Sequence, residues 1–216
     1  MSRYAVHEVF HSLQGEGTYA GRSAVFVRFA GCNLWSGREE DRAKGHGSCA
    51  AWCDTTFVGT EGSGGGRFDG AEPLAEHVGR FVPAGTARGH LVVCTGGEPL
   101  LQLDAPLVAA LRSRGYEVAI ETNGTRPMIE GGVDWVCMSP KGGTTLALER
   151  CDELKLVYPH EGLGPERFAG FPARVRYLQP LHDANHQRHL EMTVEYCLQH
   201  PEWRVSLQLH KLLGLP

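Results

Sequence analysis

The fold of this chain is constrained most by a series of short apolar runs, each of which ends in a polar or Gly/Pro-containing segment. The runs have the length of strands and are rich in Val, Ile, Leu and aromatic residues, and helical patterns separate several of them. This arrangement is typical of parallel strands joined by crossover helices. We expect strands at residues 25–29, 91–94, 118–120, 135–138, 154–157, 175–178 and 205–209.

Three other segments have a helical pattern. Helices are expected at about residues 73–81, at 105–114 behind the capping residue Asp104, and at 184–199 behind Asp183. In the last helix, Leu190, Val194 and Leu198 stand four residues apart, and they are expected to form one buried stripe.

The segments that follow the strands hold most of the polar and glycine residues of interest: 30–32, 95–99, 121–124, 139–141, 179–180 and 210–211. In a β/α barrel the carboxyl ends of the strands gather on one face, where catalysis takes place. We therefore predict an α/β fold, a partial TIM-type barrel of parallel strands with fewer helices than strands. Its 216 residues are expected to form a single domain, residues 1–216, around one core.

Composition narrows the class of partner. The formal net charge is −4, so the chain lacks the basic footprint of a protein that binds nucleic acid or an anionic membrane. A small-molecule ligand is expected instead. The first residues lack the plan of a signal peptide, and no apolar run approaches the roughly 18 residues of a membrane helix. We expect a cytoplasmic protein.

Three cysteines, Cys32, Cys49 and Cys53, lie in the loop after the first predicted strand. Three thiolates are one ligand short of a four-iron cluster, and the remaining iron could then bind another molecule. With His46 they could equally form the four-ligand set of a structural zinc site, so these residues alone leave both possibilities open. The chain has seven cysteines, an odd number that argues against a disulfide framework. The other four are expected to be core or surface thiols.

Several further segments have simple structural interpretations. Residues 95–99 and 123–124 are compatible with ordinary turns, and the glycine-rich stretch 61–70 is expected to be a flexible loop. Arg28 lies in the middle of an apolar strand, so its guanidinium needs a carboxylate or an anionic ligand.

Six motifs taken together resemble one family. They are residues 11–17 (HSLQGEG), 28–35 (RFAGCNLW), 52–55 (WCDT), 94–99 (CTGGEP), 121–124 (ETNG) and 139–141 (SPK). In this order, and over essentially the whole chain, they resemble the 7-carboxy-7-deazaguanine synthases, radical S-adenosylmethionine enzymes of queuosine biosynthesis. The resemblance favours the cluster over zinc.

The resemblance implies a definite chemistry. A 4Fe-4S cluster would bind S-adenosylmethionine at its free iron, and one electron would release a 5'-deoxyadenosyl radical. Hydrogen abstraction from 6-carboxy-5,6,7,8-tetrahydropterin would then start a ring contraction that yields 7-carboxy-7-deazaguanine and ammonia. The implied reaction is that of a carbon-nitrogen lyase, with the barrel orienting the reactants and excluding water. An electron donor such as flavodoxin or ferredoxin, and a homodimer, are also implied.

Site residues follow from the resemblance by position. Cys32, Cys49 and Cys53 correspond to the cluster ligands, and Thr55 to a magnesium position. Positions for S-adenosylmethionine are Gly97, Glu98, Glu121, Ser139, Pro140, Lys141, Gln179 and Pro180. Positions for the substrate are Leu13, Gln14, Gly15, Glu16, Arg28, Thr95 and Pro216, the last through its carboxylate. Residues 31–57 would form the cluster-binding loop, and a tail at about 207–216 would close the site.

Two features depart from the family pattern. Sixteen residues separate Cys32 from Cys49 and three separate Cys49 from Cys53, where the general spacing is three and two. His182 stands where relatives often have an acidic residue. The alternatives to the synthase are an activating enzyme that makes a glycyl radical on a partner protein and a zinc-stabilised binding domain without enzymatic activity.

Overall fold

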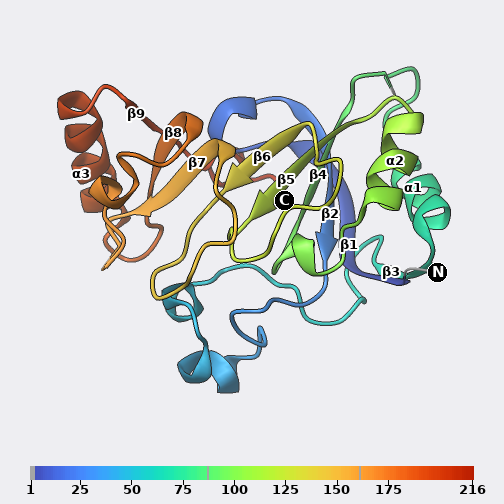
Figure 1. Ribbon diagram of the computed structural model, residues 1–216, viewed down its shortest axis with the longest axis horizontal. Helices are drawn as coiled ribbons and strands as arrows, with labels where there is room; N and C mark the ends of the chain where they lie inside the picture. Colours follow the sequence, from blue (N-terminus) through green and yellow to red (C-terminus); the bar gives the residue numbers. More distant parts are fainter. Residues whose placement is uncertain (1–2, 87, 161) are drawn as a thin grey trace.

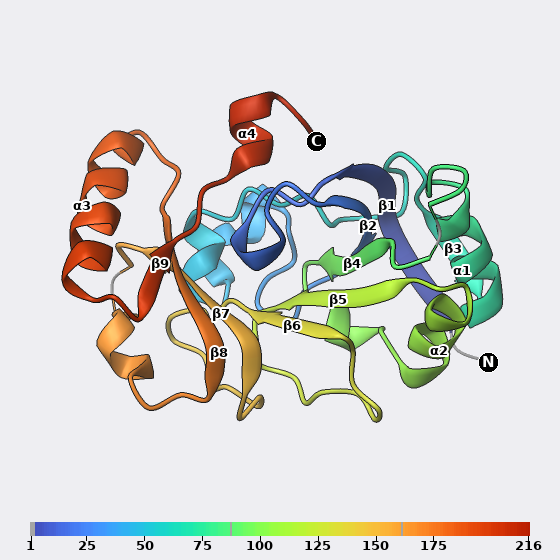
Figure 2. The ribbon, with the colours of Figure 1, turned by 90° about the horizontal axis from the view of Figure 1, so that it is seen from above.

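The computed structural model describes residues 3–86, 88–160 and 162–216, and it is built on one nine-stranded sheet in the order β3-β1-β2-β4-β5-β6-β7-β8-β9. The sheet is strongly curved and open, because its two edge strands do not pair (Figures 1 and 2). The strands are β1 (Arg3–Leu13), β2 (Ser23–Phe29), β3 (Gly66–Asp69), β4 (Leu91–Gly96), β5 (Glu117–Thr122), β6 (Trp135–Met138), β7 (Cys151–Tyr158), β8 (Ala173–Pro180) and β9 (Trp203–Val205).

The four α-helices of the described residues are α1 (Ala71–Gly79), α2 (Ala105–Ser113), α3 (His186–Gln199) and α4 (Leu209–Leu213). Helices α1 and α2 pack on each other at one end of the sheet, and α3 packs on β8 and β9 at the other (Figure 1). The middle of the sheet has no α-helix, because the connections from β5 to β6 (residues 123–134) and from β6 to β7 (residues 139–150) are loops. The prediction of an α/β fold with fewer helices than strands is confirmed.

Seven strands, β2 and β4 to β9, run parallel to one another. Two strands were missed in the sequence, and both are antiparallel: β1 pairs with β2, and β3 pairs with β1. Strand β3 lies within the stretch 61–70. The prediction of a flexible loop there is wrong for residues 66–69. The loop before it is tightly packed, since a Cβ at Gly65 would lie 2.1 Å from the His7 carbonyl oxygen.

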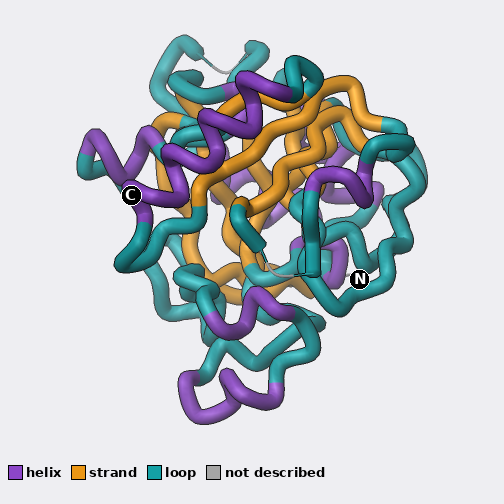
Figure 3. The backbone as a smooth tube through the Cα atoms, turned by 90° about the vertical axis from the view of Figure 1, so that its left-hand side faces the viewer, coloured by secondary structure: helices purple, strands orange, loops and turns teal. Residues whose placement is uncertain are grey.

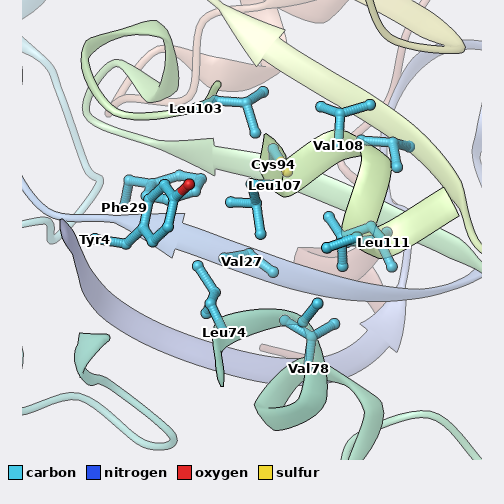
Figure 4. Packing of buried hydrophobic residues seen from close by; sticks show 14 of the residues in the cluster. Tyr4, Val27, Phe29, Leu74, Val78, Cys94, Leu103, Leu107, Val108 and Leu111 are labelled. Atoms are coloured by element: carbon cyan, nitrogen blue, oxygen red, sulfur yellow. The ribbon is translucent and has the colours of Figure 1, made fainter. Parts of the chain in front are cut away.

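The main core lies between the sheet and helices α1 and α2 (Figure 4). Val27 and Phe29 of β2 contact this core from the sheet, and Leu74 of α1 and Leu107 of α2 meet them from the helices. A second core under β6 to β8 includes Met138, Leu154, Leu156, Leu178 and Trp203. Alternate residues of the strands face these cores, so the residues between them face the concave side of the sheet.

The predicted capping residue of α2 is confirmed. The Asp104 carboxylate accepts hydrogen bonds from the Leu107 backbone N–H (3.1 Å) and from the Tyr4 hydroxyl (2.5 Å). Before α3, Asp183 instead accepts a hydrogen bond from the Asn185 N–H, and the helix begins at His186, two residues later than predicted.

Replacing Asp104 with alanine is expected to lower the free energy of unfolding by about 1–3 kcal/mol, because both hydrogen bonds are lost. Asp104→Asn keeps an acceptor at the cap, and it should cost less than the alanine. Urea denaturation of the two variants and the wild type measures the difference. Equal stability of the alanine variant and the wild type would contradict this role of Asp104.

The predicted buried stripe on α3 is wrong. Val194 is 40% exposed and Leu198 is 81% exposed, whereas His189 and Thr193 are buried against the sheet. The apolar spacing of four was real, but it marks the outer face of the helix. No helix among residues 3–86, 88–160 and 162–216 is long and apolar enough to cross a membrane.

Candidate active site

Two adjoining pockets lie on the concave side of the sheet, at the carboxyl ends of the parallel strands. The cysteine pocket is lined by the three loop cysteines and by strand-end residues that include Thr95, Gly97, Glu121, Ser139, Lys141, Gln179 and Pro180. The arginine pocket is lined by Arg28 and by segments near both ends of the chain, including Leu13, Gln14, Gly15 and Pro216. Glu16, Asp54, Thr55, Thr95, Glu121 and Gln208 line both pockets and form the wall between them.

The loop that carries the cysteines projects from the sheet, at the bottom of the view in Figure 3. It is folded around its own small core. Trp35, Ala50 and Phe57 form that core, and Cys32 and Cys53 pack against it. The Leu34 backbone N–H donates to the Cys32 sulfur over 3.4 Å. Apolar cover and N–H donors to sulfur are features that tune iron-sulfur clusters, so this donor set fits a cluster.

Burial raises the pKa of the Cys32 thiol, and it raises the pKa of Cys49 to about 11. A cysteine binds a metal as the thiolate. The positive charge of the bound metal therefore has to offset the cost of burying that thiolate.

Contacts with neighbouring loops hold the cysteine loop in place. The Ser48 hydroxyl lies 2.6 Å from His160 Nε2, and the Ser48 N–H donates to the Gly142 carbonyl (3.0 Å). Within the loop, Arg42 donates to the Ala50 carbonyl (2.5 Å) and stacks over Trp35 at 4.7 Å. The Ser48 contacts therefore bind the loop to the segments after β6 and β7, and the Arg42 contacts brace it internally.

The unusual spacing before Cys53 has a local structural basis. Residues Ser48–Ala51 form the 3-10 helix η3, and the Trp52 N–H donates to the Cys49 carbonyl (3.0 Å). Ala51 is exposed, so this tight turn takes up the extra residue while both cysteines line one pocket.

The zinc alternative requires four ligands around one ion. His46 is exposed, and the residues that the structure describes contain no group of three His, Cys, Asp or Glu side chains placed to hold a single metal ion. A cluster has different requirements, because each of its irons takes one thiolate. The arrangement of the cysteines thus favours the cluster.

Gly97 lies against the cysteine loop. A Cβ at this position would lie 2.3 Å from the Gly31 carbonyl oxygen and 2.6 Å from Cys32 Cβ. Only glycine allows this close approach of two backbone segments, which places the Gly97 backbone at the pocket beside Cys32.

Two residues predicted to contact S-adenosylmethionine do not line the cysteine pocket. Pro140 is buried beneath Ser139 and Lys141, which do line it. The Glu98 side chain is 0% exposed and accepts hydrogen bonds from the Leu100 N–H, the Thr122 hydroxyl and the Asn123 N–H. Burial raises the pKa of Glu98. Glu98 therefore joins the ends of β4 and β5, and its side chain does not face the pocket.

All seven residues predicted to contact the substrate line the arginine pocket: Leu13, Gln14, Gly15, Glu16, Arg28, Thr95 and Pro216. Sequence reasoning missed Glu8, Phe10, Phe26 and His210, which also line it. The signal for Glu8 and Phe10 was the alternation of apolar and polar residues in β1, which a β-bulge between Val6 and Glu8 interrupts and which was not assigned as a strand.

Arg28 has a protein partner that the sequence did not reveal. Its Nε donates to the Glu8 carboxylate over 2.6 Å, and both side chains are about one quarter exposed, 21% and 27%. The bond through Nε leaves the two terminal nitrogens of the guanidinium, which form the fork that suits a carboxylate ligand.

Several known proteins are similar in sequence to this chain over its whole length. A 7-carboxy-7-deazaguanine synthase of Caulobacter vibrioides is 52% identical over 213 residues, which cover 99% of each chain. The protein of the same name from Bordetella pertussis is 51% identical, again over 99% of each chain. The chain belongs to the 7-carboxy-7-deazaguanine synthase family.

The crystal structure of QueE from Escherichia coli has the same fold, with a TM-score of 0.70 at 30% identity over 95% of this chain and 94% of that one. No family model matches the chain. Membership of the synthase family implies a radical S-adenosylmethionine enzyme with a 4Fe-4S cluster. It decides against the two alternative functions, the activating enzyme and the zinc-stabilised domain.

In this synthase the wall between the two pockets is organised around a buried lysine. Lys155 Nζ donates to Glu16 Oε2 (2.5 Å) and to Glu121 Oε2 (2.9 Å). Glu16 Oε1 also accepts from Gln179 (3.0 Å) and Gln208 (2.9 Å). Burial would raise the pKa of Glu16, but the Lys155 ammonium and these donors outweigh it and lower the pKa to about 2. Sequence reasoning missed Lys155, although a single lysine in the apolar run 154–157 was a signal for it.

The C-terminal segment with α4 lies beside the loop that follows β1 (Figure 2), and His210, Lys211 and Pro216 line the arginine pocket. The predicted strand 205–209 is wrong beyond Val205, since β9 ends there and α4 begins at Leu209. The Leu209 N–H donates to the Gly15 carbonyl (2.9 Å), and Lys211 pairs with Asp54 (2.8 Å). The Ser12 hydroxyl donates to the Pro216 carbonyl oxygen over 3.2 Å. These contacts attach the C-terminal segment to the loop after β1 and to the cysteine loop.

Proposed function

We propose that the cysteine pocket holds the 4Fe-4S cluster with S-adenosylmethionine, and that the arginine pocket holds 6-carboxy-5,6,7,8-tetrahydropterin. The protein then carries out the family's reaction, a ring contraction to 7-carboxy-7-deazaguanine with release of ammonia. The observation that supports this most is the shared wall, because a radical formed in one pocket needs its target in the next.

Each group of residues has a distinct task in this proposal. The thiolates of Cys32, Cys49 and Cys53 hold the cluster, and the strand-end residues Gly97, Glu121, Ser139, Lys141, Gln179 and Pro180 hold S-adenosylmethionine. When bound, these groups supply the radical that abstracts hydrogen beside the pterin carboxylate. Arg28 binds that carboxylate with its terminal nitrogens, and the tail and the pocket walls exclude water.

Magnesium is the third cofactor of the proposal. Thr55 lines both pockets, so an ion bound to its hydroxyl would be within reach of the substrate. Asp54 has a different role, since its carboxylate pairs with Lys211. We therefore assign Thr55 as the ligand and Asp54 as a residue that joins this loop to the tail.

The direct test is anaerobic reconstitution with iron and sulfide, followed by incubation with the carboxypterin, S-adenosylmethionine, dithionite and magnesium. Mass spectrometry should detect 7-carboxy-7-deazaguanine. Reactions without magnesium are expected to be slower. A reconstituted protein that cleaves S-adenosylmethionine but leaves the carboxypterin unchanged would contradict the proposed substrate.

The protein also needs a one-electron donor, and we propose flavodoxin or ferredoxin, in the cytoplasm. The seven cysteines are all free thiols, which suits a reducing compartment. Replacing dithionite with reduced flavodoxin or ferredoxin in the same assay should sustain turnover. Failure of both donors, with dithionite still effective, would point to a different reductant.

We propose a homodimer through the outer face of α3. The apolar stripe of Leu190, Val194 and Leu198 is flanked by Gln187, Glu191 and Glu195, and an exposed apolar stripe of this kind favours a partner surface. Sedimentation should find a dimer for the wild type and a monomer for Leu198→Glu. A variant that stays dimeric would place the interface elsewhere, and a monomeric wild type would contradict the dimer.

A further inference from the structure

Lys155 is buried in a place where the strand pattern would favour an apolar residue. On either side of it in β7, Leu154 and Leu156 pack into the second core. Lys155 therefore points to the concave side, and its side chain is only 4% exposed. An ammonium is costly to bury, and buried ion pairs rarely add stability over apolar residues of similar size. A role in the site accounts for this placement better than stability does.

The two carboxylates that Lys155 contacts come from distant parts of the chain. Glu16 follows β1 and Glu121 lies on β5, and both line the cysteine pocket and the arginine pocket. An ammonium has three N–H donors, and among the described residues Lys155 donates to these two carboxylates; Lys155 itself lines the cysteine pocket. Gln14 extends the set, since its amide donates to Glu121 Oε1 over 2.9 Å.

Resting on the proposed function, we infer that Lys155 is a positioning residue that couples the two ligands. By bridging Glu16 and Glu121, it makes the two carboxylates that both ligands contact move as one unit, so that S-adenosylmethionine and the carboxypterin each bind more tightly when the other is present. The physical basis is that the first ligand settles this unit in its bound arrangement, and the second ligand then binds without that cost.

Without the ammonium, the wall would hold two carboxylates with no cation between them. Repulsion between like charges disfavours the ionised form, so loss of the ammonium would raise the pKa of this pair of carboxyls. The other titratable groups that face them are Cys137 and Glu153 beneath the wall and His210 of α4. A rearranged or protonated wall would still bind each ligand alone, but it would no longer transmit the presence of one to the other.

The test uses the reconstituted protein with its cluster oxidised, so that both ligands bind without turnover. Dissociation constants are measured for S-adenosylmethionine and for the carboxypterin, each with and without the other, in the wild type, Lys155→Met, Lys155→Arg and the surface control Arg80→Met, whose side chain is exposed at the end of α1. The wild type and the Arg80 variant should show at least about tenfold coupling, and Lys155→Met less than about twofold. Lys155→Arg keeps the charge and should recover part of the coupling.

A second readout needs no ligand. Because a carboxyl pKa raised in the folded state makes the native protein bind more protons, the melting temperature of Lys155→Met should fall, relative to wild type, as pH rises from about 5 to 8. The double variant Lys155→Met with Glu16→Gln removes the repulsion and should lose this dependence. It also serves as the binding variant if the single change prevents folding.

The outcomes separate the inference from the proposed function. If the wild type forms no 7-carboxy-7-deazaguanine, the proposed function fails. If the wild type turns over but Lys155→Met retains full coupling between the ligands, the inference about Lys155 is wrong. Weaker binding of both ligands with unchanged coupling would also overturn it, since that pattern indicates a purely structural role.

Discussion

Cys49→Ala is expected to yield a folded protein that retains no intact cluster and has no detectable turnover. The Cys49 sulfur lines the same pocket as Cys32 and Cys53, and no other cysteine lies in that loop. Loss of one of three thiolates leaves two irons without protein ligands. Iron and sulfide content, the visible absorption of the anaerobically reconstituted protein and product formation measure the effect together.

The matched control is Cys197→Ala. Cys197 is a half-buried thiol on α3, far from the cysteine loop in the fold, and its removal should leave iron content and turnover near those of the wild type (Figure 1). Retained activity in Cys49→Ala would show that the unusual spacing has been misread and that another group completes the cluster site.

Extending the chain beyond Pro216 is expected to raise the Michaelis constant for the carboxypterin at least about tenfold, with a smaller change in kcat. Pro216 lines the arginine pocket, and its terminal oxygen accepts a hydrogen bond from Ser12. We propose that the terminal carboxylate of Pro216 also accepts hydrogen bonds from the pterin. A C-terminal tag converts that carboxylate into a neutral amide and adds bulk at the pocket.

The same tag placed at the N-terminus is the control, because Arg3 lies at the start of β1 and does not line either pocket. Steady-state kinetics of the two tagged proteins and the untagged protein separate the effects. An unchanged Michaelis constant for the C-terminally tagged protein would rule out a contact between Pro216 and the substrate.

The parallel half of the fold could be predicted because its strands are continuous apolar runs, such as 91–94 and 118–120, which are buried on both faces. Strand β1 was missed because a β-bulge between Val6 and Glu8 interrupts its alternation: Val6 and Val9 are both buried although they stand three residues apart, while Glu8 and Phe10 line the arginine pocket. The tail was misassigned because Leu207 and Leu209 alternate with polar residues, although packing on Gly15 makes the segment helical from Leu209.

The pockets were predicted from motifs that stand at strand ends, where position in the chain fixes position in space. Lys155 and Glu8 could not be found in that way. Their roles depend on which side chains meet across the concave face. The sequence alone does not show which residues of β7 lie beside the loop after β1. The exposed stripe on α3 was misread for a related reason, because apolar spacing identifies one face of a helix and does not say which face the sheet covers.

Several contacts of the site join residues that are very far apart in the chain. The Gly17 N–H donates to the Ser206 hydroxyl, Gln208 to Glu16, and Ser12 to Pro216, at sequence separations of 189, 192 and 204 residues. Contacts of this kind close the longest loops, and they form late in folding. We expect the curved sheet to assemble first, so a partly folded chain should already have its core while it still cannot bind either ligand.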